Sequence, residues 1–586
     1  MNAPLPLSSL PAAPPLPDTS SRAHFPVVII GAGPTGLTLA NLLGTQGIAV
    51  LVIERSHHTV GEPRAVSIDD ESLRTLQTAG LIGEVLPHVV QGYGVHYYSW
   101  RNREFARIEP SAMENGFPKR NAFRQQVLVG QLRDGMKRFA DSAIWFGHEL
   151  LRFEDRDASG VRLELRHAPE GRDETKHITC DWLIACDGGR SPVREQLGIK
   201  LTGSTYDEKW LIVDLLDRHS AFRHTRTYCD PSRPAIRLPG PDGTLRYEFM
   251  LHDGEDPEQM LEETRVRSWI HAREPDDAQL EITRKVVYAF HARVAERWKS
   301  GRVFLAGDAA HLTPPFAGQG MNSGVRDASN LAWKLAAVVQ GRLSPALLES
   351  YEQERKPHAW SLIRMAVRIG TFMQPKSVAA AMVTQGALRL CSLFPPVRDY
   401  VMQLKFKPKP RFAKGFFVAD HNAASRKSGA VTPGQLLPQP SVQLPGGQRA
   451  LLDDVMGGGF AMLVLAGSQQ AAATAAVLES FAASGLPCKC ISVVPQRDDF
   501  LKRPASGTGP VPDAVLRDGD GVLENMLRSA NASAVLLRPD RYVLAYLGQP
   551  GPDGSAGVRQ LLSTFSATRG FSAAQTATLR ACSRFM

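Results

Sequence analysis

The sequence contains little cysteine. Seven cysteines in 586 residues, an odd number spread along the chain, argue against a disulfide-stabilised secreted fold and favour the reducing cytoplasm. Cys488 and Cys490 form a C-x-C pair, and the C-x-x-C of a dithiol redox site is absent. His and Cys at metal-ligand spacing and a Ser/His/Asp nucleophile pattern are absent too, so we expect neither a metal centre nor covalent hydrolase chemistry.

Long apolar runs and blocks of one charge are also missing. No segment reaches the apolar length of a membrane span. Residues 1–24 contain six prolines and no basic start before an apolar core, so they predict a disordered tail rather than a signal peptide. The net charge of +9 is spread along the chain without a basic block interleaved with aromatics. We therefore expect neither a membrane nor a nucleic-acid partner.

The strongest pattern that is present lies near the N-terminus. Apolar residues 27–30 predict a buried parallel strand, and residues 37–47 predict the helix that follows. Between them lies a G-x-G-x-x-G motif, made by Gly31, Gly33 and Gly36. Such glycines allow a tight turn, close approach of the backbone to a pyrophosphate, and close helix packing. A second strand, residues 49–53, ends at Glu54, where a carboxylate can bind ribose hydroxyls. The alternative is a glycine-rich turn without a ligand.

Two later strands also end beside an acidic residue and a glycine. Residues 181–186 lead into Asp187-Gly188, and residues 303–306 lead into Gly307-Asp308. A loop at 314–322 then precedes a long helix that starts near Asn322. The alternatives are that Asp187 only caps the next helix and that Asp308 only shapes a turn.

The rest of the chain predicts an α/β protein with further domains. Residues 201–285 lose helical periodicity and read as an inserted antiparallel sheet. We predict a disordered tail at 1–24, a discontinuous Rossmann-like nucleotide-binding domain at 25–200 and 286–400, a substrate-covering sheet domain at 201–285, a linker at 401–445 and a small α/β domain at 446–586.

In this order, the three glycine-containing motifs resemble those of the single-component FAD-dependent aromatic hydroxylases, the para-hydroxybenzoate and phenol hydroxylase superfamily. This resemblance covers residues 25–370. Within the superfamily, several segments resemble the 3-(3-hydroxyphenyl)propionate hydroxylases: Pro63-Arg64-Ala65, Ile68-Asp69-Asp70-Glu71, Arg120-Asn121-Ala122-Phe123, Phe249-Met250 and Arg538-Pro539-Asp540-Arg541. The C-terminal domain resembles the thioredoxin-like domain of phenol hydroxylase relatives. Because it lacks C-x-x-C, we expect it to serve as a scaffold or dimer contact.

The resemblance implies FAD as the cofactor, NADH or NADPH as a transient co-substrate, and O₂. The positions that match the family's cofactor motifs are Gly31, Ala32, Gly33, Pro34, Thr35, Gly36, Glu54, Arg55, Arg64, Gln125, Asp187, Gly307, Asp308, Pro315, Gly318, Gly320, Met321 and Asn322. A separate physical reason supports a flavin-binding role for the positions from Gly318 to Asn322. Reduced flavin is anionic at its pyrimidine edge, and a helix N-terminus stabilises negative charge there.

The resemblance also implies ortho-hydroxylation of a phenolic acid through a flavin C4a-hydroperoxide, as in the conversion of 3-(3-hydroxyphenyl)propionate or 3-hydroxycinnamate to a 2,3-dihydroxy product during aromatic degradation. This reaction needs a proton acceptor near the phenol and a dry pocket. The catalytic candidates are Asp214, Arg246 and Pro315, and the substrate-binding candidates are Tyr206, Arg237, Tyr247 and Glu248. Arg237 and Arg246 are the candidates for a substrate carboxylate. For each candidate in the sheet the alternative is an ordinary strand residue.

Other functions remain open at this point. Within the class, the substrate could be resorcinol or 3-hydroxybenzoate. With the same fold, the protein could be a reductase, an epoxidase or a halogenase, although the halogenase segment G-W-x-W-x-I-P is absent. The remaining alternatives are a nicotinamide dehydrogenase and a non-enzymatic FAD-binding sensor. A homodimer is the expected assembly.

Overall fold

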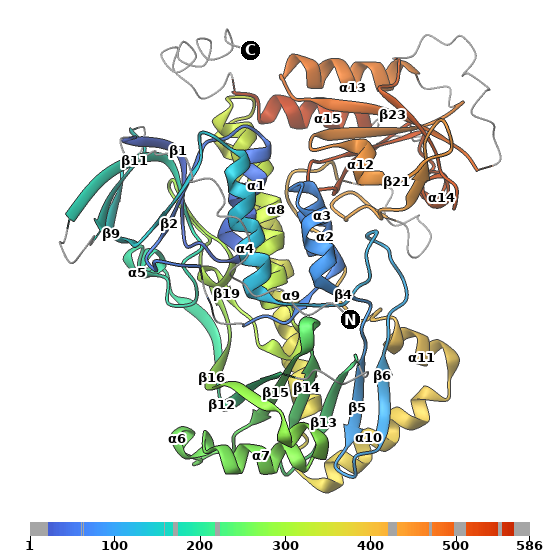
Figure 1. The fold of residues 1–586 in the computed structure, drawn as a ribbon. Helices are drawn as coiled ribbons and strands as arrows, with labels where there is room; N and C mark the ends of the chain where they lie inside the picture. Colours follow the sequence, from blue (N-terminus) through green and yellow to red (C-terminus); the bar gives the residue numbers. More distant parts are fainter. Residues whose placement is uncertain are drawn as a thin grey trace.

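The computed structural model describes residues 22–59, 61, 64–156, 159–167, 174–216, 223–419, 431–467, 471–496, 511–548 and 554–567, with only the backbone described at 205–208, 471 and 472. Three large sheets divide this part of the chain into three regions: a mostly parallel sheet, an antiparallel sheet below it and a C-terminal sheet at the upper right (Figure 1). This arrangement confirms the predicted α/β class. Most of the predicted N-terminal tail lies outside the described residues.

The first sheet is built around the predicted nucleotide-binding strand. Its order is β17-β18-β11-β1-β2-β8, with β10 and β9 continuing antiparallel from β11. Strand β1 is parallel to β2 and to β11, and the last four residues of β1 are buried, as expected for a strand covered on both faces. The strands are β1 (His24–Ile30), β2 (Val50–Glu54), β8 (Ala143–Phe146), β9 (His148–Asp155), β10 (Val161–His167), β11 (Glu174–Ala185), β17 (Lys299–Ser300) and β18 (Val303–Leu305).

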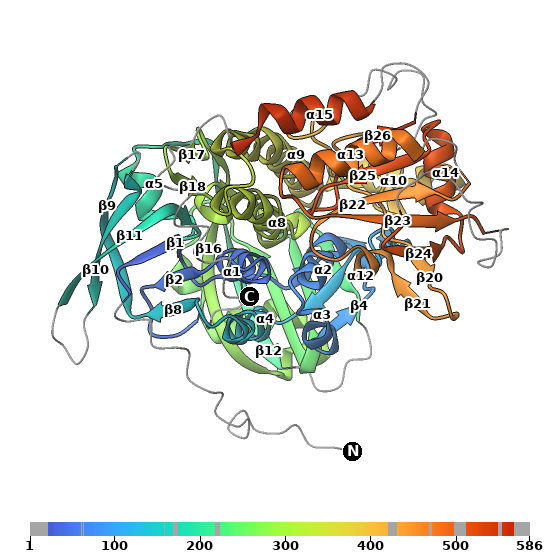
Figure 2. The same cartoon turned by 90° about the horizontal axis from the view of Figure 1, so that it is seen from above.

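Helices pack against this sheet as a layer. Helix α1 (Pro34–Thr45) lies against both α4 (Gln125–Gly135) and α8 (Gly320–Val339), and α2 (Asp70–Thr78) lies against α8 (Figure 2). Asp69 caps α2 by accepting a hydrogen bond from the Ser72 N–H, a role for which aspartate is a favoured residue. Smaller elements complete the region: α3 (Ile82–Val85), α5 (Pro192–Gln196), β3 (Ser67–Ile68), β4 (Val89–Gln91) and β7 (Asn121–Phe123).

The second sheet is larger than the predicted insertion. Its order is β19-β16-β12-β15-β14-β13-β5-β6, so two strands from the first part of the chain complete it. All its pairs are antiparallel except β13 with β5. The strands are β5 (Val95–Ser99), β6 (Glu104–Ile108), β12 (Leu201–Leu216), β13 (Thr225–Cys229), β14 (Ala235–Pro239), β15 (Thr244–Met250), β16 (Glu281–Ala295) and β19 (His311–Leu312).

The two faces of this second sheet have different neighbours because side chains alternate along each strand. One face, with Leu211, Val213 and Phe249, forms a core with residues of α6 (Pro257–Met260) and α7 (Glu263–His271). The other face, with Trp210 and Ile212, forms a separate cluster with Phe316 and the end of α9 (Glu349–Met373). We call this second face the inner face, because it faces the loop that precedes α8.

The C-terminal region contains the third sheet, ordered β21-β20-β24-β23-β22-β25-β26. Its strands are β20 (Ser441–Gln443), β21 (Arg449–Leu451), β22 (Phe460–Leu465), β23 (Cys488–Val494), β24 (Ala514–Arg517), β25 (Ala534–Leu537) and β26 (Val543–Leu547). Its helices are α12 (Leu452–Met456), α13 (Ala471–Ala483), α14 (Val522–Ser529) and α15 (Gly554–Thr564). Phe460 and Leu544 share one apolar core with residues of α8, so this region is docked on the rest of the chain.

The segment predicted as a linker differs from that expectation. It begins within α11 (Pro395–Met402), and it contains Phe412 and Phe416, which are buried, and Lys407, which forms ion pairs with the α2 region. Its proline, lysine and glycine content suggested a solvated connection, but the described parts of the segment pack between the first and third sheets.

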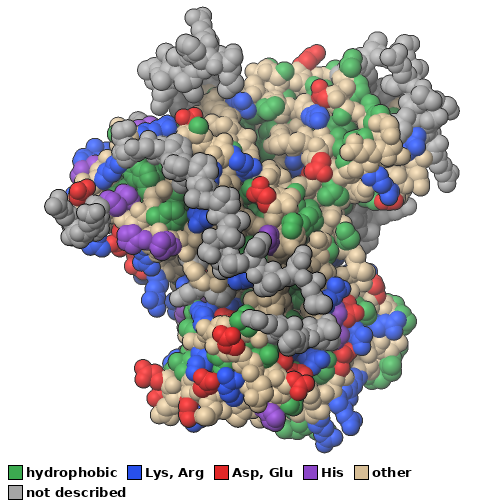
Figure 3. All heavy atoms as spheres, in the orientation of Figure 1, with side chains coloured by type: hydrophobic (Ala, Val, Ile, Leu, Met, Phe, Trp, Pro, Cys, Tyr) green, Lys and Arg blue, Asp and Glu red, His purple; other side chains and the backbone are tan. Residues whose placement is uncertain are grey.

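Helix α10 (Val378–Ser392) and α11 carry an unusual apolar surface. Exposed side chains along this stretch include Met382, Val383, Leu390, Leu393 and Phe394. Figure 3 shows blue basic and green apolar side chains mixed at the lower right, where Figure 1 places these helices. Among the described helices, none is by itself long and apolar enough to cross a membrane. Helices α10 and α11 reach that length and apolar composition only when taken together, and the pair is bent by 111°.

Candidate functional site

The predicted motifs meet at one edge of the first sheet. The Gly31 N–H donates to the Ile53 carbonyl at 2.7 Å, the Cys186 N–H to the Ile30 carbonyl at 2.8 Å, and the Ala306 N–H to the Ala185 carbonyl at 2.9 Å. These bonds join the carboxyl ends of β1, β2, β11 and β18. The G-x-G-x-x-G loop, Glu54, Asp187 and Gly307-Asp308 therefore lie together at one edge of the sheet. Open α/β sheets bind ligands in a crevice at this edge, and we call this place the crevice.

The three glycines of the first loop play different parts. Gly31 has φ +105°, and a Cβ there would lie 2.4 Å from the Cys186 carbonyl oxygen; a Cβ on Gly36 would lie 2.1 Å from the Gly31 oxygen. Both are required for the turn and for packing. A Cβ on Gly33 would meet nothing within 4 Å. Gly33 also caps α1, whose N-terminus has no side-chain cap and starts with Pro34. This loop thus leaves an open, positively polarised place for a phosphate.

Glu54 and its neighbour lie at the end of β2. The Glu54 carboxylate accepts hydrogen bonds from the Ala32 N–H at 3.0 Å and the Ser56 N–H at 2.9 Å. Its position is therefore fixed, and each oxygen retains acceptor capacity for a ribose hydroxyl. Arg55 is exposed.

Gly307 and Asp308 form a tight turn against α1 and α8. Gly307 has φ +60°, and a Cβ there would lie 2.6 Å from the Thr35 hydroxyl. Its N–H donates to Asp327 at 3.0 Å, which also contacts the buried His311 at 2.7 Å. By contrast, the Asp308 carboxylate has no hydrogen-bond partner in the described chain, and burial raises its pKa. An unpartnered carboxylate beside the crevice fits a hydroxyl-bearing ligand better than a purely structural turn.

Asp187 caps a helix with one carboxylate oxygen and leaves the other oxygen available to a ligand. Its Oδ2 accepts a hydrogen bond from the Val193 N–H at 3.2 Å in the first turn of α5, so it contributes to capping that helix. Its Oδ1 is buried without a partner among the described residues. Burial raises the pKa of this carboxyl group. The free oxygen is available to a ligand in the crevice.

Two loops close the crevice opposite the glycine motif. The Gln125 side-chain oxygen accepts from the backbone N–H groups of Arg64 at 3.0 Å and Ala65 at 2.6 Å, so Gln125 positions the first loop, while the Arg64 side chain is exposed. The second loop leads into α8, where Asn322 in the first turn donates to the carbonyls of Gly318 at 2.6 Å and Ser67 at 3.1 Å. The two loops are thereby joined.

The second loop leads directly into the N-terminus of α8. Pro315 lies in a 3-10 turn, and Gly318 ends it with φ +61°. Helix α8 begins at Gly320 without a side-chain cap, so its first N–H groups, around Met321, are free of side-chain partners. A second uncapped helix N-terminus thus lies beside that of α1, as expected for an anionic flavin edge.

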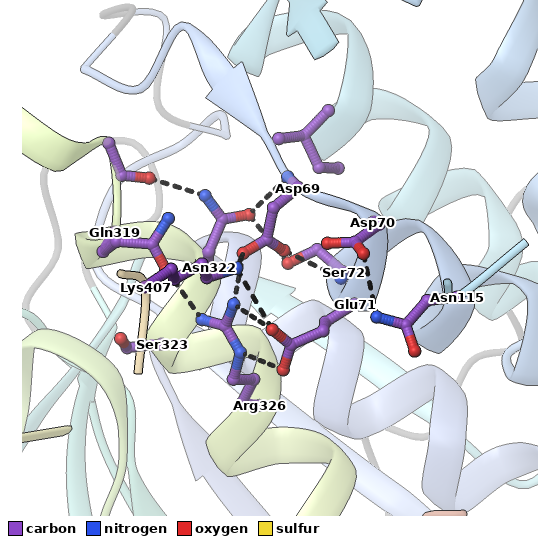
Figure 4. Close-up of polar contacts among 12 residues, drawn as sticks. Asp69, Asp70, Glu71, Ser72, Asn115, Gln319, Asn322, Ser323, Arg326 and Lys407 are labelled. Atoms are coloured by element: carbon purple, nitrogen blue, oxygen red, sulfur yellow. Dashed lines mark hydrogen bonds and ion pairs between the residues drawn. The ribbon is translucent and has the colours of Figure 1, made fainter. Parts of the chain in front are cut away.

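A buried charged cluster supports this loop from below (Figure 4). Arg326 on α8 donates to Glu71 at 2.7 Å and also contacts Asp69, and Lys407 contacts Asp69 at 3.0 Å and Glu71 at 3.1 Å. Burial alone raises the pKa of Glu71, but Arg326 and Lys407 outweigh it and hold that pKa well below its usual range. The cluster ties α2, α8 and the segment after α11 together and fixes the first turns of α8, which carry Asn322.

The predicted substrate residues divide between the two faces of the second sheet. On the outer face Arg237 donates to Asp277 at 2.6 Å, and the Tyr247 hydroxyl contacts the same carboxylate at 2.5 Å. On the inner face Arg246 pairs with Asp214 at 2.7 Å, and Glu248 is buried. The side chain of Tyr206 lies outside the described residues. The structure therefore separates Arg237 and Tyr247 from the other candidates.

An open groove lies at the edge of the same inner-face cluster. It has a volume of about 610 Å³ and is lined by aromatic and apolar residues, among them Tyr97, Phe372 and Phe406, together with Arg364 and Arg368 of α9. Within the described chain neither arginine has an ionic or hydrogen-bonding partner. The sequence analysis missed both. Their spacing of four residues on a predicted helix is a weak signal, because it is common on exposed helix faces.

Comparisons with known proteins agree with this geometry. A family model for an FAD binding domain matches residues 24–366, and a model for the HcaD C-terminal domain matches residues 434–556. A 3-(3-hydroxy-phenyl)propionate/3-hydroxycinnamic acid hydroxylase of Klebsiella pneumoniae is 38% identical over 89% of this chain and 91% of its own length. A second such enzyme, from Burkholderia vietnamiensis, is 37% identical over 93% of this chain and 97% of its own length.

Solved structures share the fold over almost the whole chain. The flavin-dependent monooxygenase PieE, in complex with FAD and substrate, has a TM-score of 0.73 at 24% identity and covers 93% of this chain and 100% of its own. Aklavinone-11 hydroxylase, in a ternary complex with FAD and aklavinone, has a TM-score of 0.73 at 25% identity and covers 93% of this chain and 99% of its own.

Proposed function

Because the chain belongs to the family of FAD-dependent aromatic hydroxylases that includes the 3-(3-hydroxyphenyl)propionate/3-hydroxycinnamic acid hydroxylases, we propose that it hydroxylates a phenolic acid with NAD(P)H and O₂. The substrates are 3-(3-hydroxyphenyl)propionate and 3-hydroxycinnamate, and the products are the 2,3-dihydroxy acids. The observation that carries this proposal is the 38% identity over 89% of the chain.

The residues of the crevice fit FAD. The open space at Gly33 and the α1 N-terminus suit the pyrophosphate, and Glu54 suits the adenosine ribose. The unpartnered Asp308 carboxylate suits the ribityl hydroxyls, and the start of α8 suits the pyrimidine edge. When bound, FAD would take electrons from NAD(P)H and supply the O₂-activating chemistry by which one oxygen atom of O₂ enters the ring. The protein binds and orients both partners and excludes water.

The groove gives the substrate's acid group a place to bind. The sequence assigned this role to Arg237 and Arg246, but both are paired, with Asp277 and Asp214 respectively. Arg364 and Arg368 instead lie among aromatic side chains. Gly370, on the same helix, packs against the Phe316 ring, next to Pro315. The two arginines are therefore placed to hold a carboxylate while the aromatic end points toward the Pro315 loop.

The test of this function is NADH and NADPH oxidation by the purified protein, with O₂ consumption and peroxide release followed together. The panel is 3-(3-hydroxyphenyl)propionate, 3-hydroxycinnamate, 3-hydroxybenzoate and resorcinol. We expect the two arylpropanoid acids to stimulate oxidation and to give catechol products with little peroxide. If only another phenol stimulates oxidation, the proposed substrate is wrong and the assignment as an aromatic hydroxylase stands. Bound FAD with no stimulation by any phenol would contradict the proposal and favour a reductase, an epoxidase or a sensor.

Removal of the two groove arginines should weaken binding of the acid selectively. For Arg364→Gln/Arg368→Gln we expect KM for 3-(3-hydroxyphenyl)propionate to rise about 10-fold or more, which corresponds to about 1.4 kcal/mol, with kcat little changed. KM for 3-ethylphenol, which lacks the carboxylate, should stay the same. Arg398→Gln, an exposed arginine on α11, is the matched control. An equal rise in KM for acid and phenol would rule out carboxylate binding by this pair.

The assembly and the cell compartment are further parts of the proposal. We propose a cytoplasmic homodimer without nucleic-acid or membrane partners, in keeping with the low cysteine content. The C-terminal domain serves as a scaffold, because its Arg538 forms buried ion pairs with Glu354 of α9 at 2.8 Å.

A further inference from the structure

Glu248 is a buried carboxyl group that the sequence names as a substrate-binding candidate and to which the proposed function gives no chemical step. It lies on β15, on the inner face, and is 6% exposed. Its neighbours across the sheet are Ile212 on β12 and Ile236 on β14. In the described chain its carboxyl group accepts and donates no hydrogen bond. A buried carboxyl group without a partner is costly, so its retention at this place calls for a function.

The position of Glu248 relates it to the reaction site. Ile212 and Ile236 belong to the same apolar cluster as Trp210 and Phe316, and the rings of Trp210 and Phe316 lie 5.5 Å apart. Phe316 follows Pro315 in the loop that precedes α8. Glu248 therefore lies in the surface of the sheet that covers this loop.

Asp214, the nearest other carboxylate on this face, is already engaged. It accepts two hydrogen bonds from Arg246, at 2.7 and 3.2 Å, and one from Arg284 at 3.3 Å. Arg246 also donates to the Arg64 carbonyl at 3.0 Å. This ion pair holds the sheet against the loop at residue 64, and both carboxylate oxygens of Asp214 are occupied by guanidinium groups.

The acidity of Glu248 suits proton transfer near neutral pH. Burial raises its pKa to about 7; the Arg246 guanidinium opposes this shift and the Asp214 carboxylate adds to it. The other charged groups around this point are Arg284 on β16 and Arg64 in the facing loop. A general base is most effective when its pKa lies near the working pH.

We propose that Glu248 is the general base that accepts the proton of the substrate's phenolic hydroxyl. This inference rests on the proposed function. The phenolic O–H bond breaks and a carboxyl O–H bond forms, so the negative charge moves from Glu248 to the phenolate and makes the ring electron-rich for oxygen transfer. After oxygen insertion the same substrate oxygen is a carbonyl. It regains the proton from Glu248 as the hydroxylated ring carbon loses its own proton to water, which restores the carboxylate.

The test compares Glu248→Gln with the wild type under substrate saturation. We expect kcat to fall about 100-fold or more, with FAD content and KM nearly unchanged. The kcat of the wild type should rise with pH through a pKa near 7, because the base must be ionised. The kcat of the variant should not show this rise. A polyfluorinated substrate that keeps a hydrogen at the reacting carbon, and whose phenol is acidic enough to ionise near neutral pH, should recover most of the lost rate. Glu248→Asp should recover part of it.

Tyr228→Phe is the matched control, because it removes a buried hydroxyl from the same sheet on the outer face. It should leave the pH profile unchanged. A Glu248→Gln enzyme that keeps the rise of kcat with pH, or that loses equal activity with the fluorinated and parent phenols, would overturn the assignment. The proposed function is tested separately, by the phenol panel with the wild-type protein. If no phenol stimulates NAD(P)H oxidation by the wild type, the proposed function fails whatever the Glu248 variants show.

Discussion

The Gly33→Val variant is expected to fold and to lose FAD. A Cβ at Gly33 meets nothing within 4 Å, and the residue has φ −82° and ψ −178°, an extended conformation that valine adopts readily. The added side chain points into the space assigned to the pyrophosphate. We expect the affinity for FAD to fall at least about 100-fold, about 2.7 kcal/mol, and the protein to purify colourless and without NADH oxidase activity.

The measurement is FAD content by absorbance and affinity by titration, alongside circular dichroism and thermal melting. Loss of the glycine N-cap should cost at most about 1 kcal/mol of stability. Gly83→Val, at an exposed glycine whose Cβ would also meet nothing within 4 Å, should retain FAD. A yellow Gly33→Val enzyme would place the cofactor elsewhere. Gly36→Val is expected to unfold instead, because its Cβ would lie 2.1 Å from the Gly31 oxygen.

Glu354→Gln is expected to cause the largest loss of stability, about 3–5 kcal/mol. The Glu354 carboxylate is fully buried and accepts hydrogen bonds from Lys334 at 2.7 Å, Arg538 at 2.8 Å and Asn330 at 2.6 Å. Arg538 comes from the C-terminal domain. A neutral glutamine leaves two buried cations with less compensation and weakens the contact between α9 and that domain. Denaturant unfolding and limited proteolysis should show this domain released first.

The same carboxylate gives a pH dependence with a defined sign. Burial by itself raises the pKa of Glu354, but Arg538 and Lys334 reverse this and lower it to about 2, from an ordinary value of 4.5. A folded-state pKa below the unfolded value stabilises the fold above pH 4.5, and this contribution is lost as the pH falls from 4.5 toward 2. The variant should lack this component of acid unfolding. Glu349→Gln, on the same helix but exposed, should change stability by less than about 1 kcal/mol. Equal stability of the two variants would contradict the prediction.

Local patterns were sufficient to predict the crevice. Each of its motifs is a strand that ends in a turn, and the turn residues follow from the conformations they must adopt: Gly31 and Gly307 have positive φ, and Gly36 packs without a side chain. Because the carboxyl ends of parallel strands share one edge, three motifs far apart in the chain could be expected at one site. The comparisons confirm the resulting family and cofactor.

Local patterns could not sort the residues of the second sheet. Alternation shows that Arg246 and Glu248 share a face of β15 and that Tyr247 faces the other way, but it does not show which face covers the Pro315 loop. The partners of Arg237 and Arg246 are also remote: Asp277 lies in a turn after α7, and Asp214 lies on the neighbouring strand. Whether an arginine is free for a substrate depends on such partners.

The sequence by itself determined the strand-turn-helix units and the cofactor class, because the motifs that indicate them consist of residues close together in the chain. Only the tertiary structure decided that β5 and β6 complete the second sheet and that Phe412 and Phe416 pack where a linker was expected. It also decided that Arg364, Arg368 and Glu248 have no hydrogen-bonding partner among the described residues. These outcomes depend on burial and charge partners supplied by distant segments, and no local pattern encodes which of those segments meet.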